Sequence, residues 1–186
     1  DALAHCLEAY CAPGYHPLAD GIAVEGIRLA LENLPRVAAN PNDIDARGNM
    51  MSAAAMGATA FQKGLGAIHA LSHPVGALYD THHGMTNAVF MPYVLLVNRD
   101  AIEARIARLA AYCGLSPTLD AFLHAVTALR AKLNVPHTLK DFKVDDTKRD
   151  LIGDMAIVDP TAGGNPITLT RELALEIFDR AYSGRL

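Results

Sequence analysis

The stretch that most constrains this chain runs from residue 60 to residue 98 and holds four of its eight histidines. These are His69, His73, His82 and His83. His69 and His73 are four residues apart, so on a helix they lie on one face with about 6 Å between their Cβ atoms. The neighbouring residues are mostly small or apolar, and a buried imidazole needs a polar partner to offset its lost hydration. The stretch therefore predicts a buried polar site built on a helix.

The distance from His69 to the later histidines requires a break in that helix. One straight helix would separate His69 from His83 by about 21 Å, too far for a shared metal ion. Turn-forming and helix-capping residues lie between them: Asp80, Thr81 and Gly84. We expect a helix that ends near Tyr79, after which the chain folds back. This fold-back would bring either His82 or His83 towards His69, and spacing alone leaves that choice open.

The remaining segments show the three-to-four-residue apolar spacing of helices, and none alternates convincingly enough for a strand. The expected helices are residues 1–10, 17–37, 44–62, a segment after Gly66 to about Tyr79, and 86–97, 101–112, 118–133, 150–157 and 170–182. Eight or nine helices without strands predict an all-α fold, a compact multi-helix bundle. Residues 159–166 form a loop whose paired glycines lack the context of a phosphate-binding loop.

Three segments carry more specific expectations. The small residues and methionines in the middle of 44–62 suit tight helix packing in the centre of the domain. Pro92 predicts a kink or an early break in the apolar helix 86–97. The charged run 140–149 is expected to be a solvated loop.

Composition narrows the class of protein. The chain has 186 residues, 51% of them hydrophobic, which indicates one sizeable buried core. It has no apolar run long enough to span a membrane, and no signal-peptide pattern opens it. A net charge of −4 with scattered basic residues argues against a nucleic-acid partner. Three cysteines without C-x-x-C spacing are expected to be reduced thiols in a cytoplasmic protein.

The first residues are ambiguous when considered alone. The chain starts at Asp1 without an initiator methionine, which suggests a fragment or a cleaved domain. Asp1 and His5 are four apart and share a helix face. Without further information, this pair is best explained as a carboxylate favoured by the helix dipole beside a surface histidine.

Longer motifs change that interpretation. The chain contains D-A-L-x-H at residues 1–5 and A-F-Q-K-G-L-G-x-x-H-A-x-x-H-P-x-G-A-x-Y at 60–79. H-G-M-x-N-A-x-x-x-P-x-V-x-x-x-N follows at 83–98, and a weaker match, G-G-N-P-x-x-L-T, at 163–170. This pattern resembles the iron-containing (group III) alcohol dehydrogenase family. The resemblance implies that residues 1–186 form the all-helical metal-binding and catalytic domain of a two-domain enzyme, and that the N-terminal dinucleotide-binding domain is absent from this chain.

The resemblance also implies a set of site residues. Asp1, His5, His69 and His83 match the family's metal ligands, three nitrogens and one oxygen, a donor set that suits divalent iron or zinc. His83 is preferred over His82 because it directly precedes the glycine of the family's H-G element. His73 matches the second histidine of the H-x-x-x-H pair, which lies near the nicotinamide and the substrate. We therefore expect His73 to be the catalytic and cofactor-contacting residue, as part of a proton relay.

The implied reaction is hydride transfer between an alcohol and its aldehyde or ketone, with NAD or NADP as the second substrate. Fe2+ is the expected metal in the native enzyme, with Zn2+ as the alternative, because nitrogen-rich sites bind zinc more tightly than iron(II). A small alcohol or aldehyde and the N-terminal nucleotide-binding domain are the expected partners. Family resemblance further suggests a homodimer. The fragment alone is expected to be mostly inactive.

Other functions are compatible with parts of the pattern. Glycerol dehydrogenases and dehydroquinate synthases share the two-domain architecture, but the four-ligand Asp/His set favours the alcohol dehydrogenase branch. Maleylacetate reductases resemble the family without being expected to keep all four ligands. In a different class, the isolated chain could act as a non-catalytic helical domain that binds metal or a partner.

Overall fold

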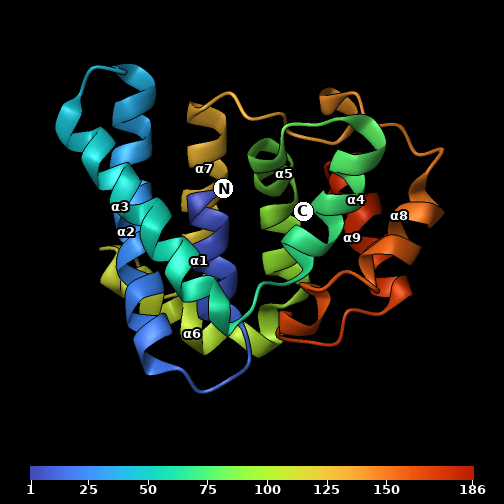
Figure 1. Cartoon of the computed structure of the whole chain (residues 1–186), viewed down its shortest axis with the longest axis horizontal. Helices are drawn as coiled ribbons and strands as arrows, with labels where there is room; N and C mark the ends of the chain where they lie inside the picture. The colour runs from blue at the N-terminus through green and yellow to red at the C-terminus, as the bar shows by residue number, and fades with distance from the viewer.

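The computed structural model describes all 186 residues. The chain forms nine α-helices and three short 3-10 helices, joined by turns and loops, and it contains no strand (Figure 1). The helices are α1 (Ala2–Cys11), α2 (Pro17–Ala39), α3 (Ile44–Ala60), α4 (Ala67–Tyr79), α5 (His83–Val97), α6 (Arg99–Tyr112), α7 (Leu119–Lys132), α8 (Arg149–Ala156) and α9 (Arg171–Ser183). This confirms the predicted all-α class. None of the helices combines the length and apolar character that crossing a membrane would need.

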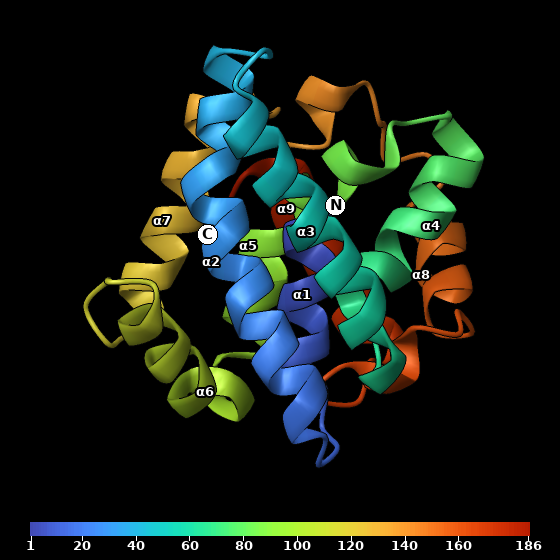
Figure 2. The same ribbon diagram turned by 60° about the vertical axis from the view of Figure 1, so that its left-hand side comes forward.

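The helices form two groups that meet at the centre of the molecule. Helices α1, α2 and α3 contact one another on one side, and α4, α5, α8 and α9 pack together on the other (Figure 1). In the view of Figure 2, α1, α2 and α3 lie side by side at the front. Helix α1 also contacts α5, and α6 and α7 contact each other as well as α2 and α5. A single hydrophobic cluster runs through both groups. The start of α1 is thereby held against the start of α5, where two of the histidine motifs lie.

The break after α4 forms as the sequence predicts. Asp80 adopts a left-handed conformation with φ 52° and ψ 43°, which ends α4 at Tyr79. The next helix begins at His83, and the ring of His82 accepts a hydrogen bond from the backbone N–H of Met85 at 3.3 Å. His82 is therefore the N-cap of α5, a role usually taken by Ser, Thr, Asp or Asn.

Pro92 does not shorten α5. The helix continues from His83 to Val97, so of the two expected effects, a kink or an early break, the break does not occur. Proline removes one backbone donor from the ladder, yet here its neighbours Phe90 and Tyr93 are fully buried. The apolar packing on all sides of this helix outweighs the missing hydrogen bond.

Helix α3 is less central than its composition predicts. Only Ala46, Ala53, Gly57 and Ala60 are buried along it, while Met51 is 75% exposed. The buried stripe does pack closely: a Cβ added to Gly57 would lie 2.9 Å from the Cβ of His5. Small residues therefore line the buried face of α3, where α1 packs against it, and the opposite face is exposed to solvent.

The charged run 140–149 is only partly a loop. Lys140–Phe142 form a 3-10 turn, and Leu139 and Val144 on either side of it are buried. The remaining side chains of the run are mostly exposed, as expected for a solvated connection.

Candidate metal centre

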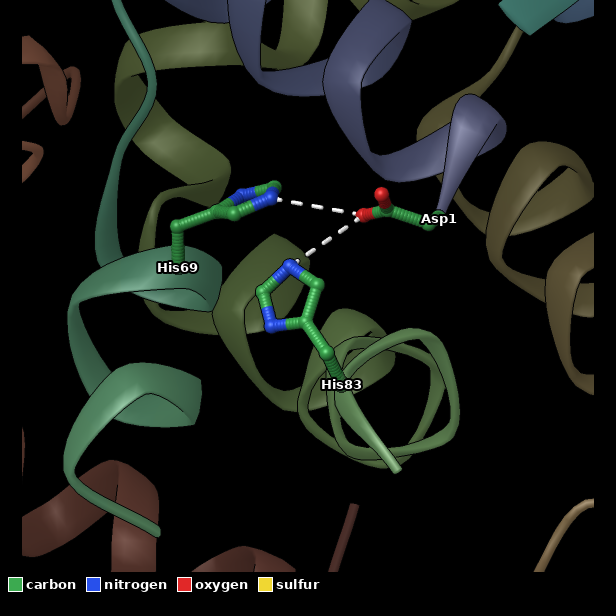
Figure 3. A group of neighbouring side chains, drawn as sticks. All are labelled: Asp1, His69 and His83. Carbon is green, nitrogen blue, oxygen red and sulfur yellow. Dashed lines mark ion pairs between the residues drawn. The ribbon is translucent and has the colours of Figure 1, made fainter. Parts of the chain in front are cut away.

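Three side chains from three separate elements meet at one point. Asp1 lies just before α1, His69 is in the first turn of α4, and His83 is the first residue of α5 (Figure 3). The Oδ1 atom of Asp1 is 3.5 Å from Nε2 of His69 and 3.5 Å from Nε2 of His83. Each of the three residues offers a ligand atom within 4.8 Å of the others. The fold-back after α4 is what brings His83 to this point.

These separations match the requirements of a small divalent cation. Metal–nitrogen and metal–oxygen bonds of about 2.0–2.2 Å in a tetrahedral arrangement place ligand atoms about 3.4 Å apart. The side chain of His69 is almost fully buried, whereas those of Asp1 and His83 are 38% and 42% exposed. The group is therefore anchored on one side and open on the other, as a site that admits a substrate must be.

His5 lies directly beside this group. Its Nε2 is 3.6 Å from Oδ2 of Asp1, the carboxylate oxygen that the other two histidines do not face. Its ring stacks on that of His69, with centroids 4.9 Å apart. The structure thus places all four expected ligands in one cluster, with three of them converging and His5 at its edge.

The electrostatics of the cluster favour neutral imidazoles. Burial and the neighbouring rings of His69 and His83 lower the pKa of His5 to about 4. Burial and the neighbouring histidines also lower the pKa of His83 below its ordinary value. Because metals bind the neutral ring, His5 and His83 present their nitrogens in the form that a cation requires.

Asn87 shows that the group has more acceptors than the protein can satisfy. Its Nδ2 is 2.8 Å from Oδ1 of Asp1, 3.2 Å from Nε2 of His69 and 3.1 Å from Nε2 of His83. An amide NH2 carries two hydrogens, so it cannot donate to all three atoms when both imidazoles present the lone pair of Nε2. Its own carbonyl oxygen is buried without a partner. A cation among these lone pairs would satisfy them, so the residues present fit a bound metal.

Sequence reasoning missed Asn87 and a second residue, Glu8. Glu8 is buried, and its Oε2 is 2.5 Å from Nδ1 of His69. Helix spacing could have indicated both: Glu8 follows His5 by three residues and Asn87 follows His83 by four, so each shares a face with an expected ligand.

His73 lies at the open side of the cluster. Its ring stacks on that of His83 with centroids 5.5 Å apart, and its Nδ1 is 2.8 Å from Oδ2 of Asp159. Burial opposes the ionisation of Asp159, but hydrogen bonds from Thr161 and His73 outweigh it and hold the pKa of the carboxyl below its ordinary value. Asp159 belongs to the loop 159–166, which the sequence did not connect with the site.

A helical domain that brings together two histidines and a carboxylate, with two further histidines beside them, has the arrangement expected of a metal-binding enzyme domain. Comparison of the chain with known proteins identifies the family. Residues 1–182 match the model of the Fe-containing alcohol dehydrogenase family, C-terminal. The chain belongs to this family, which confirms the resemblance carried by the histidine motifs.

Individual relatives agree with this assignment. The chain is 41% identical over 175 residues to a 4-hydroxybutyrate dehydrogenase of Cupriavidus necator, covering 89% of this chain and 46% of the relative. It is 34% identical to a 1,3-propanediol dehydrogenase of Citrobacter freundii, covering 98% of this chain and 49% of the relative. A crystal structure of a 1,3-propanediol oxidoreductase superposes with a TM-score of 0.92 at 34% identity, covering 98% and 50%. The chain thus spans about half the length of these relatives.

Proposed function

We propose that this chain is the metal-binding catalytic domain of an alcohol dehydrogenase that interconverts a small alcohol and its aldehyde or ketone using NAD or NADP. The observation that carries the proposal is the convergence of His69 and His83 on one carboxylate oxygen of Asp1, each at 3.5 Å. A binding surface alone would not require three potential ligand atoms that face one point and share a single amide NH2 group.

The proposed ligands are Asp1, His5, His69 and His83, and the proposed native metal is Fe2+. Zinc is the alternative because a nitrogen-rich site binds it more tightly than iron(II) at equal supply. When bound, the ion would supply Lewis-acid polarisation of the substrate oxygen. The chain's own contribution is to hold the donors in place from three elements and to leave the side of Asp1 and His83 open for a substrate.

His73 is the proposed proton carrier. It stands beside His83 at the open side, its side chain is 42% exposed, and Asp159 holds its Nδ1. A carboxylate on Nδ1 keeps the hydrogen there and leaves Nε2 free to take a proton from an alcohol or return it to an aldehyde. The exposed ring can then exchange that proton with water.

A dinucleotide-binding domain in the same polypeptide is proposed to complete the enzyme. The chain spans about half of its relatives, and it has no strand on which a nicotinamide-binding fold could be built. The 186 residues alone should therefore show little or no dehydrogenase activity. The names of the relatives support a small hydroxylated substrate, such as a diol or a hydroxy acid.

The proposal is tested on the complete gene product loaded anaerobically with Fe2+ or Zn2+. Oxidation of NADH or NADPH is measured with a series of short aldehydes, before and after chelation. We expect activity that is lost on chelation and restored by one of the two metals. Stoichiometric metal binding with no turnover of any aldehyde or alcohol would instead favour a non-catalytic metal-binding domain.

A further inference from the structure

Glu8 is a buried acidic residue that has no role in the proposed reaction. It lies on α1 among buried apolar residues, and only 6% of it is exposed. Burying a carboxylate is costly unless hydrogen bonds compensate it. Both of its oxygens are in fact occupied, one by the ring of His69 and one by a backbone N–H.

We infer that Glu8 is a positioning residue that fixes the tautomer of His69, and hence the direction of the lone pair on its Nε2. The inference rests on the proposed metal site. A carboxylate only accepts hydrogen bonds, so a contact of 2.5 Å between Oε2 and Nδ1 places the ring hydrogen on Nδ1. The opposite nitrogen, Nε2, then presents its lone pair towards Asp1, which is 3.5 Å away.

The second oxygen of Glu8 fixes the helix that carries His69. Oε1 accepts the backbone N–H of Ile68 at 2.7 Å, in the first turn of α4. The N-cap of that helix is Gly66, which has no side chain to satisfy the exposed N–H groups. A Cβ on Gly66 would lie 3.2 Å from Oε1, closer than most such contacts. Glu8 thus replaces the missing cap and complements the positive end of the helix dipole.

Helix α1 therefore contacts both nitrogens of the same imidazole. Asp1, the N-cap residue of α1, faces Nε2, and Glu8, about two turns further along the helix, bonds to Nδ1. The ring of His69 cannot rotate or exchange tautomers without losing one of these contacts. Such outer carboxylate partners raise the basicity of a ligating histidine and set its orientation.

Glu8→Gln separates the two roles of this side chain. The amide oxygen can still accept the hydrogen bond from the backbone N–H of Ile68. The amide NH2 group then faces Nδ1 of His69 and donates to it, which places the hydrogen of the neutral ring on Nε2. The expected result is a switch of the His69 tautomer in the metal-free protein, visible in the 15N shifts of the ring. Affinity for Co2+ or Zn2+ should fall about 10–100-fold.

A matched control removes the neighbouring cap without touching the ring. Asn165 accepts the N–H of Ala67 at 3.2 Å, so Asn165→Ala weakens the same helix start and should leave the tautomer of His69 unchanged. The measurements are made on the complete gene product labelled with 15N-histidine.

The tautomer separates this inference from the proposed enzyme function, because it is measured without metal or substrate. Finding His69 protonated on Nε2 in the wild-type protein would overturn the inference, even if Glu8→Gln does not fold. So would an unchanged tautomer and an unchanged metal affinity in a folded Glu8→Gln protein. A wild-type Nδ1–H tautomer that switches in this variant supports it, whether or not the enzyme turns over.

Discussion

Asp159 and His73 are joined by a contact of 2.8 Å between Oδ2 and Nδ1, although 86 residues separate them in the chain. This contact connects the loop 159–166 to the centre of α4. It gives His73 a fixed orientation at the open side of the histidine cluster.

Asp159→Asn is expected to slow turnover about tenfold or more in the complete, metal-loaded enzyme. The amide oxygen can still accept a hydrogen bond from Nδ1, but it no longer carries the charge that stabilises a protonated ring. A positioned acid or base raises the reaction rate on the order of 10²–10⁴-fold. Steady-state kinetics should show the loss in kcat, with metal content unchanged. A loss confined to KM would place Asp159 in substrate binding instead.

The two adjacent histidines provide a matched pair of variants. His83→Ala removes a proposed ligand and should weaken metal binding on the order of 10²-fold or more. Even the loss of a residue that only hydrogen-bonds to a ligand typically lowers metal affinity by about 10–100-fold. His82→Ala removes only the cap of α5 and should cost about 1 kcal/mol of stability. Isothermal titration with Zn2+ and thermal unfolding separate the two effects. Equal metal affinity in both variants would exclude His83 as a ligand.

The histidine cluster should make the metal-free protein sensitive to acid. The pKa of His5 is lowered to about 4 in the folded state, so the unfolded chain binds a proton more readily. The free energy of unfolding is therefore unaffected above about pH 6.5, falls as the pH drops towards 4, and levels off below it. The loss attributable to His5 is at most about 3 kcal/mol, reduced by residual solvent screening.

Urea unfolding across this pH range, in wild type and in His5→Gln, checks the prediction. The variant should show a flatter dependence between pH 4 and 6.5. An identical slope in both proteins would mean that His5 titrates normally in the folded state.

Two glycines of α2 test the close packing of α1. A Cβ at Gly26 would lie 2.5 Å from Sγ of Cys6, whereas nothing lies within 4 Å of a Cβ at Gly21. Gly26→Ala should destabilise the protein by about 1–3 kcal/mol through overpacking. Gly21→Ala should stabilise it by up to about 1 kcal/mol, because alanine is the better helix former. Chemical denaturation of both variants measures the difference, and a neutral Gly26→Ala would show that the helices can move apart.

Much of the fold follows from local sequence signals. Asp43 and Thr170 cap α3 and α9 through side-chain bonds to Ala46 and Leu173, as their positions predict. The break at Asp80 could also be anticipated from turn chemistry. These features depend on neighbours along the chain, which the sequence shows directly.

The rest depends on how distant elements approach each other. Spacing could not choose between His82 and His83, because both follow the same turn and only packing decides which one faces His69. Likewise, helix spacing places Glu8 on the same face of α1 as His5, but it does not show that Glu8 would meet His69 on α4. The exposed face of α3 was misjudged because small residues and methionines are compatible with either side of a helix.

We propose that Asp1, His69 and His83 bind a divalent metal, with His5 as the fourth ligand. The most direct measurement is a crystal structure of the anaerobically iron-loaded protein, with anomalous data at the iron absorption edge. We predict a single strong peak about 2.0–2.2 Å from Oδ1 of Asp1 and from the Nε2 atoms of the histidines. Iron bound elsewhere, or no anomalous peak at this cluster in a protein that contains iron by elemental analysis, would contradict the account.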